Sequence, residues 1–138
     1  MQILNNTNRL GLDKLKMVAG VSNKDITTTD VGYQISPRLN VAGRIGSPET
    51  ALALLCANTE GKALALAKEL NDLNIRRQDL QRKAMEEADE LVNSDMLEED
   101  RLLVLLGDWS QGITGIIAGK LRDKYMRPVV VCTWDSKK

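Results

Sequence analysis

The residues of this chain best suited to binding an anion are Arg38, Asn40 and Arg44, which lie within one short glycine-containing segment. A guanidinium group donates paired hydrogen bonds whose spacing matches two oxygens of a phosphate or a carboxylate. The segment 36–46 shows no clean hydrophobic period, and Pro37 disfavours helical geometry at the residue before it. We therefore predict a phosphate-binding loop. Arginines that tie the loop to carbonyl or carboxylate groups would suit the same pattern equally well.

A second, weaker candidate is the turn at 107–112, where Trp109, Ser110 and Gly112 precede a predicted helix. Backbone N–H groups at the start of a helix can bind an anion. A nucleotide-binding phosphate loop is not expected, because that pattern requires Ser or Thr directly after its lysine, and Lys120 is followed by leucine. Glycines that only permit a tight strand-to-helix turn are the favoured alternative.

The chain lacks most of the side chains that catalysis or metal binding would need. It has no histidine and two widely separated cysteines, which excludes His-dependent zinc sites, a four-cysteine site and nucleophiles paired with histidine. The carboxylates at 86–90 point in different directions around a helix and are expected to form a solvated face. Only two Trp and two Tyr are present, too few for a base-stacking platform. We predict no catalytic residue, no metal ligand and no bound cofactor in this chain.

The composition is that of a globular protein without electrostatic bias. The 19 basic and 19 acidic residues balance, so bulk charge does not indicate nucleic acid or an anionic membrane as a partner. No stretch approaches the roughly 18 apolar residues of a membrane span, and the N-terminus lacks the apolar core of a secretory signal. Both cysteines lie in apolar runs, as buried thiols in a reducing compartment do. These features predict a soluble cytoplasmic protein without a membrane partner.

The first two thirds of the chain, zones 1–46 and 47–96, are predicted to be mainly helical. The expected helices are 8–19, 27–35, 48–57 and a long one at about 61–93. Their expected N-terminal caps are Asn8, Thr27 or Thr28, Ser47 and Thr59, with Gly20 as a C-terminal stop. The long helix carries an apolar stripe at helical spacing, formed by Leu66, Leu70, Leu73, Leu80, Ala84, Ala88 and Leu91. Such a helix usually bridges domains or pairs with another helix.

The last zone, 97–138, reads as a β-α-β unit. Short continuous apolar runs at 101–106 and 128–133 are typical of buried parallel strands, and the helix 113–125 lies between them. Glycines at 115 and 119, one turn apart, would permit close approach of this helix to the sheet. Two parallel strands bury little surface alone, so this unit is expected to continue beyond the chain. The predicted fold class is α/β, a mainly helical N-terminal part followed by an incomplete β-α-β unit.

Several motifs in this order resemble the RecJ family of single-stranded-DNA-specific exonucleases, within the DHH phosphoesterase superfamily. The most specific parts are the PRLNVAGR segment at 37–44 and the GITGIIAG segment at 112–119. The other matching parts are Asn8-Arg9 with Gly11-Leu12, the segments 30–33, 51–56 and 124–129, and Leu70-Asn71 with Asn74 and Arg77. One position departs from the family, which usually has His where Ser110 follows Trp109.

The resemblance implies a domain order and a function. Residues 1–46 would be the C-terminal end of the DHH domain, 47–96 a helical connector, and 97–138 the start of the DHH-associated C-terminal domain. The parent enzyme would hydrolyse single-stranded DNA from a 5′ end with Mn or Mg, in DNA repair and recombination. The family's metal-binding aspartates and histidines would lie outside this chain. The chain would supply scaffold and part of the DNA-binding cleft, and would be inactive alone.

Two alternatives to an exonuclease remain open. The first is a phosphodiesterase of the same superfamily that acts on short oligonucleotides or cyclic dinucleotides. The second is a non-enzymatic helical module for binding or oligomerisation, in which the stripe of the long helix would pair with a partner helix. The oligomeric state itself is left open by the sequence.

Overall fold

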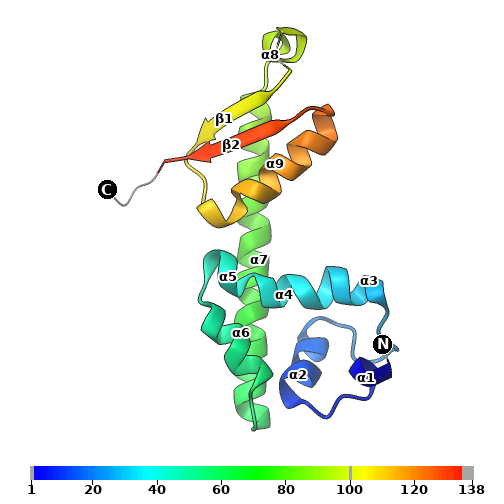
Figure 1. The fold of residues 1–138 in the computed structure, drawn as a ribbon. Helices are drawn as coiled ribbons and strands as arrows, with labels where there is room; N and C mark the ends of the chain where they lie inside the picture. The colour runs from blue at the N-terminus through cyan, green and yellow to red at the C-terminus, as the bar shows by residue number, and fades with distance from the viewer. Residues whose placement is uncertain (1, 100, 135–138) are drawn as a thin grey trace. The chain divides into compact units, whose positions relative to one another are not determined.

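The computed structural model describes residues 2–99 and 101–134, and it divides into two compact units. Unit 1 is Met1–Arg76 and unit 2 is Arg77–Lys138. The long helix α7 (Glu60–Glu90) contributes its first part to unit 1 and its second part to unit 2 (Figure 1). No helix in the described part of the chain is both long and apolar enough to cross a membrane.

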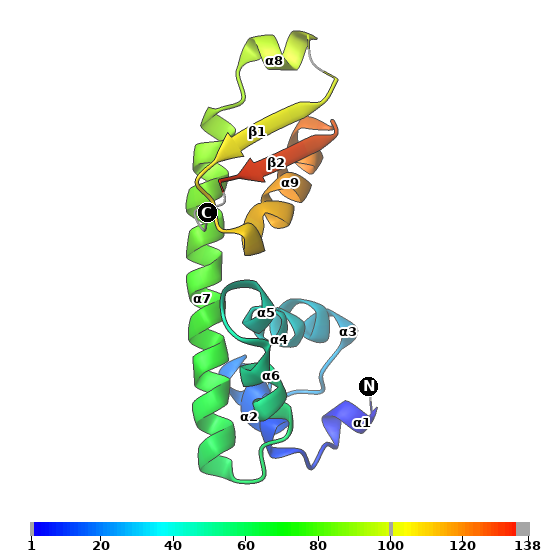
Figure 2. The same ribbon diagram turned by 60° about the vertical axis from the view of Figure 1, so that its left-hand side comes forward.

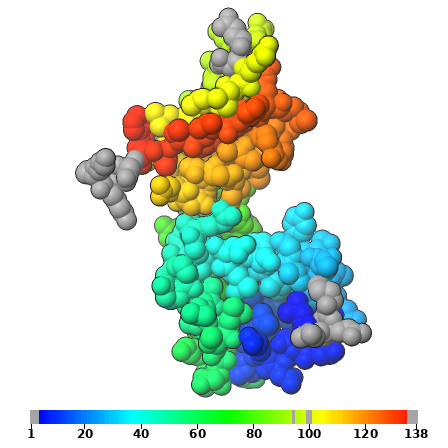
Figure 3. All heavy atoms as spheres, in the orientation of Figure 1, coloured from blue at the N-terminus to red at the C-terminus, as the bar shows by residue number. Residues whose placement is uncertain are grey.

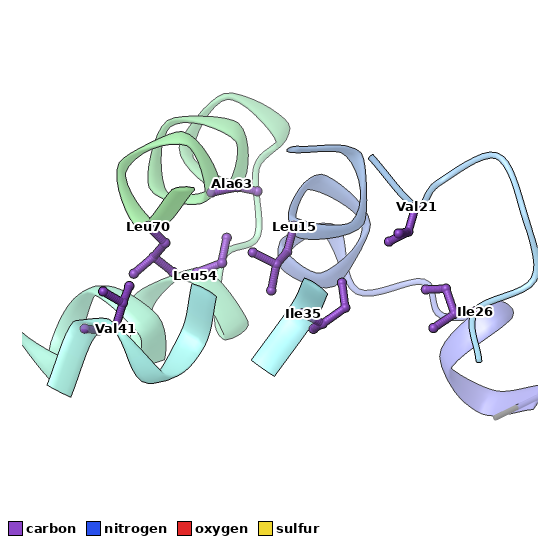
Figure 4. Close-up of a cluster of buried hydrophobic side chains, with 10 residues drawn as sticks. Leu15, Val21, Ile26, Ile35, Val41, Leu54, Ala63 and Leu70 are labelled. Carbon is purple, nitrogen blue, oxygen red and sulfur yellow. The ribbon is translucent and has the colours of Figure 1, made fainter. Parts of the chain in front are cut away.

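Unit 1 consists of short helices packed on the first half of α7. In chain order they are α1 (Gln2–Asn5), α2 (Leu10–Val18), α3 (Thr28–Asp30), the π-helical turn η1 (Val31–Ile35), α4 (Ser36–Asn40), α5 (Ala42–Ile45) and α6 (Pro48–Leu55). Their apolar side chains converge on one cluster, which contains Leu15, Val21, Ile26, Ile35, Val41, Leu54, Ala63 and Leu70 (Figure 4). This core explains why helices too short to be stable alone form here.

The predicted helix starts agree with the structure within one or two residues. Thr27 caps α3 in a reciprocal capping box, in which its hydroxyl accepts the N–H of Asp30 and the Asp30 carboxylate accepts the N–H of Thr27. The cap of α2 is Arg9 rather than Asn8. Ser47 precedes α6 as expected, but its side chain makes no capping hydrogen bond. Gly20 follows α2 with a φ of 74°, the left-handed conformation expected of a C-terminal stop.

The segment 36–46, predicted as a loop, is helical instead. Ser36 has right-handed helical angles, φ −58° and ψ −40°, although a proline follows it. Its N–H donates to the carbonyl of Val31, five residues earlier, in a π-type turn. Because Pro37 has no N–H to offer the residue four positions before it, this wider turn accommodates the proline within the helix. Burial of Val41 and neighbouring side chains outweighs the local preference for extended backbone.

The predicted long helix is confirmed as α7, which begins directly after Thr59 and ends at Glu90. Its buried stripe has two apolar stretches, one in each unit, formed by Ala63, Ala67 and Leu70 and by Ala84 and Ala88. Between them Asn74 and Gln81 are also buried, although both are polar. Leu91, predicted to extend the stripe, lies beyond the helix and is 47% exposed.

Unit 2 is the predicted β-α-β unit, built on the second half of α7. The strands β1 (Leu103–Gly107) and β2 (Val129–Thr133) are parallel neighbours, in a register that pairs Leu105 with Val131. The helix α9 (Gln111–Tyr125) connects them and lies along the sheet (Figure 2). A short helix, α8 (Ser94–Glu99), was not predicted. The α/β fold class is confirmed.

The core of unit 2 lies on one face of this sheet. Ile113, Ile117 and Leu121 of α9 are buried against β1 and α7. The glycines at 115 and 119 do not face the sheet, because a Cβ at either position would meet no atom within 4 Å. Our interpretation that these glycines permit close helix–sheet approach was therefore wrong. The opposite face of the sheet is apolar and exposed, and it is formed by Val104, Leu106, Val130 and Cys132.

Candidate phosphate-binding site

The side chain of Arg38 is held by two neutral groups. Its Nε donates to the Oδ1 of Asn71 at 3.0 Å, and its Nη1 donates to the backbone carbonyl of Gln34 at 2.6 Å. Asn71 belongs to α7 and Gln34 to η1, so the guanidinium joins two separate elements of unit 1. A guanidinium has five N–H donors. Beyond these two bonds, the remaining donors of Arg38 make no hydrogen bond within the part of the chain that the structure describes.

The charge of Arg38 has no acidic partner among the described residues. The residue is half-buried, and burial lowers the pKa of its guanidinium from the ordinary value. Arginine nevertheless stays protonated at neutral pH. A partly desolvated cation is unfavourable unless an anion compensates it. The geometry therefore suits an external anion that accepts from the remaining donors.

Asn40 and Arg44 lie near Arg38 in sequence but on the exposed side of their helices. Both residues are exposed, whereas Val41 and Ala42 between them are buried. Asn40 is the last residue of α4 and Arg44 lies in α5, so the two side chains come from consecutive short helices. The cyan segment that holds them lies at the surface of unit 1 (Figure 3). The structure thus separates the three predicted residues into one anchored arginine and two exposed polar side chains.

Asn71 is a residue of this candidate site that reasoning from the sequence did not assign. It lies 33 positions from Arg38, and no local spacing connects the two. The one available signal was its place in the Leu70-Asn71 motif of the long helix. The structure also supports the structural alternative for Arg38, because its contacts tie α4 to α7.

The second candidate site has a different character. Trp109 is 6% exposed and its indole N–H donates to Glu87 at 2.9 Å. The ring covers Gly107, where a Cβ would lie 2.5 Å from a ring atom, so this position requires glycine. Ser110 precedes α9 without a capping hydrogen bond from its side chain, and Gly112 lies in the first turn. This placement favours packing as the role of Trp109.

The carboxylates at 86–90 are exposed or half-buried, as expected of a solvated helix face, but two of them also accept hydrogen bonds within unit 2. Glu87 accepts the hydrogen bond from Trp109. Asp89 accepts hydrogen bonds from Lys124 and from the hydroxyl of Tyr125. Both bonds lower the pKa of Asp89, and the bond from Lys124 has the larger effect. Two of the carboxylates therefore tie α7 to α9 and to the turn before it, within unit 2.

The described residues do not offer a set of ligands for a metal ion. No group of three or more His, Cys, Asp or Glu side chains is assembled anywhere in residues 2–99 and 101–134. We therefore place no metal-dependent step on this chain. That this chain binds no cofactor of its own stays a prediction.

Comparison with known proteins defines the class of protein to which this arrangement corresponds. No family model matches the chain. Two crystal structures of RecJ from Thermus thermophilus, in complex with Mg²⁺ and with Mn²⁺, superpose on 96% of the chain with TM-scores of 0.84 and 0.83 at 29% identity. The helical unit, the long helix and the parallel α/β unit are therefore similar to a segment of these RecJ structures, of which the chain covers 20% and 19%.

The sequence comparison names the same protein. The chain is 36% identical over its whole length to the single-stranded-DNA-specific exonuclease RecJ of Bacillus subtilis. It is 33% identical to RecJ of Escherichia coli over 88% of the chain. The chain spans only 18% and 22% of the lengths of these two relatives. It is thus similar to RecJ along nearly all of its length and corresponds to a small part of that protein, which confirms the resemblance.

Proposed function

We propose that this chain is part of a single-stranded-DNA-specific exonuclease that hydrolyses phosphodiester bonds from a 5′ end. Within that enzyme it supplies scaffold and a phosphate-binding part of the DNA cleft, in which Arg38, Asn40 and Arg44 contact the strand. The similarity to RecJ supports the reaction and the substrate. The hydrolytic residues and their Mn or Mg ions are proposed to lie in the four fifths or so of a RecJ-type protein that this chain does not span.

The observation that carries the proposal is the environment of Arg38. A half-buried guanidinium held by an amide and a carbonyl keeps its full charge and several donors for a ligand. A carboxylate partner in place of these neutral groups would have compensated that charge internally. Phosphate is the anion that single-stranded DNA presents at every nucleotide, and its paired oxygens match the fork of a guanidinium.

Binding of a fluorescently labelled, 5′-phosphorylated oligothymidylate to the chain tests this role by anisotropy. Arg38→Gln is expected to weaken binding about tenfold, because a hydrogen bond to a charged group is lost. Arg44→Gln should reduce affinity as well. Each substitution should make the plot of the logarithm of the binding constant against the logarithm of salt concentration less steep, by about one unit of slope. Lys62→Gln, which removes an exposed charge at the start of α7, is the matched control.

The proposal is contradicted if both arginine variants bind the strand with the same affinity and the same salt dependence as Lys62→Gln. The chain alone should release no nucleotides from the strand in the presence of Mn²⁺. Cleavage by the chain would show that the chain itself carries hydrolytic residues.

The other two functions remain predictions. A phosphodiesterase for short oligonucleotides or cyclic dinucleotides would differ from the proposed enzyme in lacking processive digestion of long strands. A module that pairs through the stripe of α7 would need that stripe to be exposed. Most of the stripe is instead buried or half-buried within its own units, and Leu70, Ala84 and Ala88 are almost fully buried.

A further inference from the structure

Tyr33 is an exposed aromatic residue five positions before the anchored arginine. Its side chain is 76% exposed, and its hydroxyl makes no hydrogen bond within the part of the chain that the structure describes. It lies in the π-helical turn η1, directly before Gln34. The carbonyl of Gln34 is the group that accepts from Arg38 at 2.6 Å. The aromatic ring and the guanidinium are therefore both attached to one short stretch of helix.

The other described aromatic residues do not share this situation. Trp109 is buried and bonded to Glu87. Tyr125 is half-buried and donates to Asp89. Trp134 is exposed but belongs to unit 2, at the end of the described residues. Tyr33 is the one aromatic residue in the sequence of unit 1, and no hydrogen bond or ring contact among the described residues accounts for it.

The backbone next to Tyr33 is open to solvent. Gly32 is exposed, and a Cβ built on it would meet no atom within 4 Å. Asn40, which lies in the helix that follows this turn, is exposed as well. A glycine inside a helix is unfavourable by about 0.5–1 kcal/mol relative to alanine. No packing within unit 1 explains its presence at position 32, and close approach by a ligand would.

We propose that Tyr33 stacks on one nucleobase of a single strand whose phosphate is bound by Arg38. This inference rests on the proposed function and adds a base-binding subsite to it. A tyrosine ring accepts any of the four bases, because each presents a flat face. The subsite would therefore contribute affinity without sequence preference, and it would require an unpaired base. A subsite for one base requires a single aromatic ring, so it is compatible with the small number of aromatic residues in this chain.

Two probes of equal length separate stacking from phosphate binding: an oligothymidylate and an abasic strand with the same phosphodiesters. Tyr33→Ala should weaken oligothymidylate binding about fivefold or more and leave abasic binding unchanged. Tyr33→Phe should retain the wild-type affinity, and Tyr33→Leu should not, because an apolar side chain without a ring cannot stack. Arg38→Gln should weaken binding of both strands equally.

A second readout uses the wild-type chain and does not depend on any variant. The chain has two tyrosines, and Tyr125 in unit 2 serves as an internal reference for Tyr33 in the NMR spectrum. Ring currents of a stacked base should move the ring-proton signals of Tyr33 upfield on addition of oligothymidylate. The abasic strand should not move them, and the Tyr125 signals should stay in place with both strands.

The proposal is overturned if Tyr33→Ala has no effect, if it weakens both strands equally, or if the Tyr33 signals do not move. These results would leave the phosphate site intact as long as Arg38→Gln still weakens binding. The reverse combination, a base-specific loss in Tyr33→Ala with no effect of Arg38→Gln, would support the stacking subsite and contradict the proposed phosphate contact.

Discussion

At the scale of single residues, the arrangement around Arg38 depends on the neutrality of its partners. Asn71 offers an uncharged oxygen, so it orients the guanidinium without compensating its charge. An aspartate at this position would have the same shape and would form an ion pair. The choice of an amide therefore preserves the capacity of the arginine to bind an external anion.

Substitutions of Asn71 should separate orientation from charge. Asn71→Asp is expected to keep the protein folded and at least as stable, because the carboxylate still accepts from Nε. It should nevertheless weaken binding of the oligonucleotide about tenfold, because the ion pair competes with phosphate. Thermal unfolding and anisotropy on the same sample measure the two effects. A residue with a purely structural role would give a stable variant with unchanged affinity.

Asn71→Leu is the matched variant without an acceptor. It leaves an N–H of the half-buried Arg38 unpaired, which should lower the free energy of unfolding by about 1–3 kcal/mol. Affinity for the strand should fall as well, since the guanidinium is no longer held in one orientation. Equal stability of Asn71→Leu and the wild type in urea unfolding would contradict the importance of this hydrogen bond.

At the scale of elements, the capping box at the start of α3 makes the stability of unit 1 depend on pH. Hydrogen bonds from Lys24, and then from Thr27, lower the pKa of Asp30 from an ordinary value of 3.8 to about 2. The unfolded chain therefore binds a proton at Asp30 at a higher pH than the folded chain does. The stabilisation is fully present above about pH 4 and is lost as the pH falls toward 2.

Asp30→Asn should remove this dependence. The variant is expected to be less stable than the wild type at pH 7, because it loses the ion pair with Lys24 and the carboxylate that accepts from Thr27. The difference should shrink between pH 4 and pH 2, where the wild-type carboxyl becomes protonated. Urea unfolding of both proteins across this range is the measurement. A constant difference down to pH 2 would contradict the assigned role.

Two glycines in helices should respond oppositely to alanine. Gly115 in α9 has open space around it and no positive φ, so Gly115→Ala should stabilise unit 2 by about 0.5–1 kcal/mol. Gly11 in α2 packs on α6, and a Cβ there would lie 1.9 Å from the carbonyl oxygen of Leu54. Gly11→Ala should therefore destabilise unit 1. Urea unfolding compares the two, and destabilisation by Gly115→Ala would indicate a contact at α9 that the structure does not show.

At the scale of the whole molecule, residues 2–99 and 101–134 form two hydrophobic cores that share no residue. Leu70 is fully buried in one of them and Leu121 in the other. Truncation of a buried leucine to alanine usually costs about 2–5 kcal/mol. Each substitution should therefore act mainly on its own unit, although α7 belongs to both.

Leu70→Ala and Leu121→Ala can be compared with probes in each unit. Both tryptophans lie in unit 2, so their fluorescence follows that unit, and the NMR signals of Tyr33 follow unit 1. Leu70→Ala is expected to lower the urea midpoint of the Tyr33 signals more than that of the tryptophan fluorescence. Leu121→Ala should do the opposite. Equal shifts of both probes in both variants would show that the chain unfolds as one cooperative unit.

The elements that local patterns determine were predictable from the sequence. The long helix has a sustained helical period and no interior proline, and the two strands are short apolar runs on either side of a helix. The Thr27 cap and the Gly20 stop depend on the chemistry of single residues at the ends of a helix. Similarity to RecJ was likewise detectable, because motif order is a property of the sequence alone.

Tertiary packing decided the rest. Burial of Ile35, Val41 and Ala42 made the arginine segment helical in spite of Pro37, and a π-type turn before the proline accommodates its missing N–H. The pairing of Arg38 with Asn71 could not be derived from spacing, since the two meet only when α4 packs on α7. The sequence by itself determined which side chains carry guanidinium and amide donors. Only the fold decided which of them is anchored and which are exposed, because long-range contacts set burial and hydrogen-bond partners.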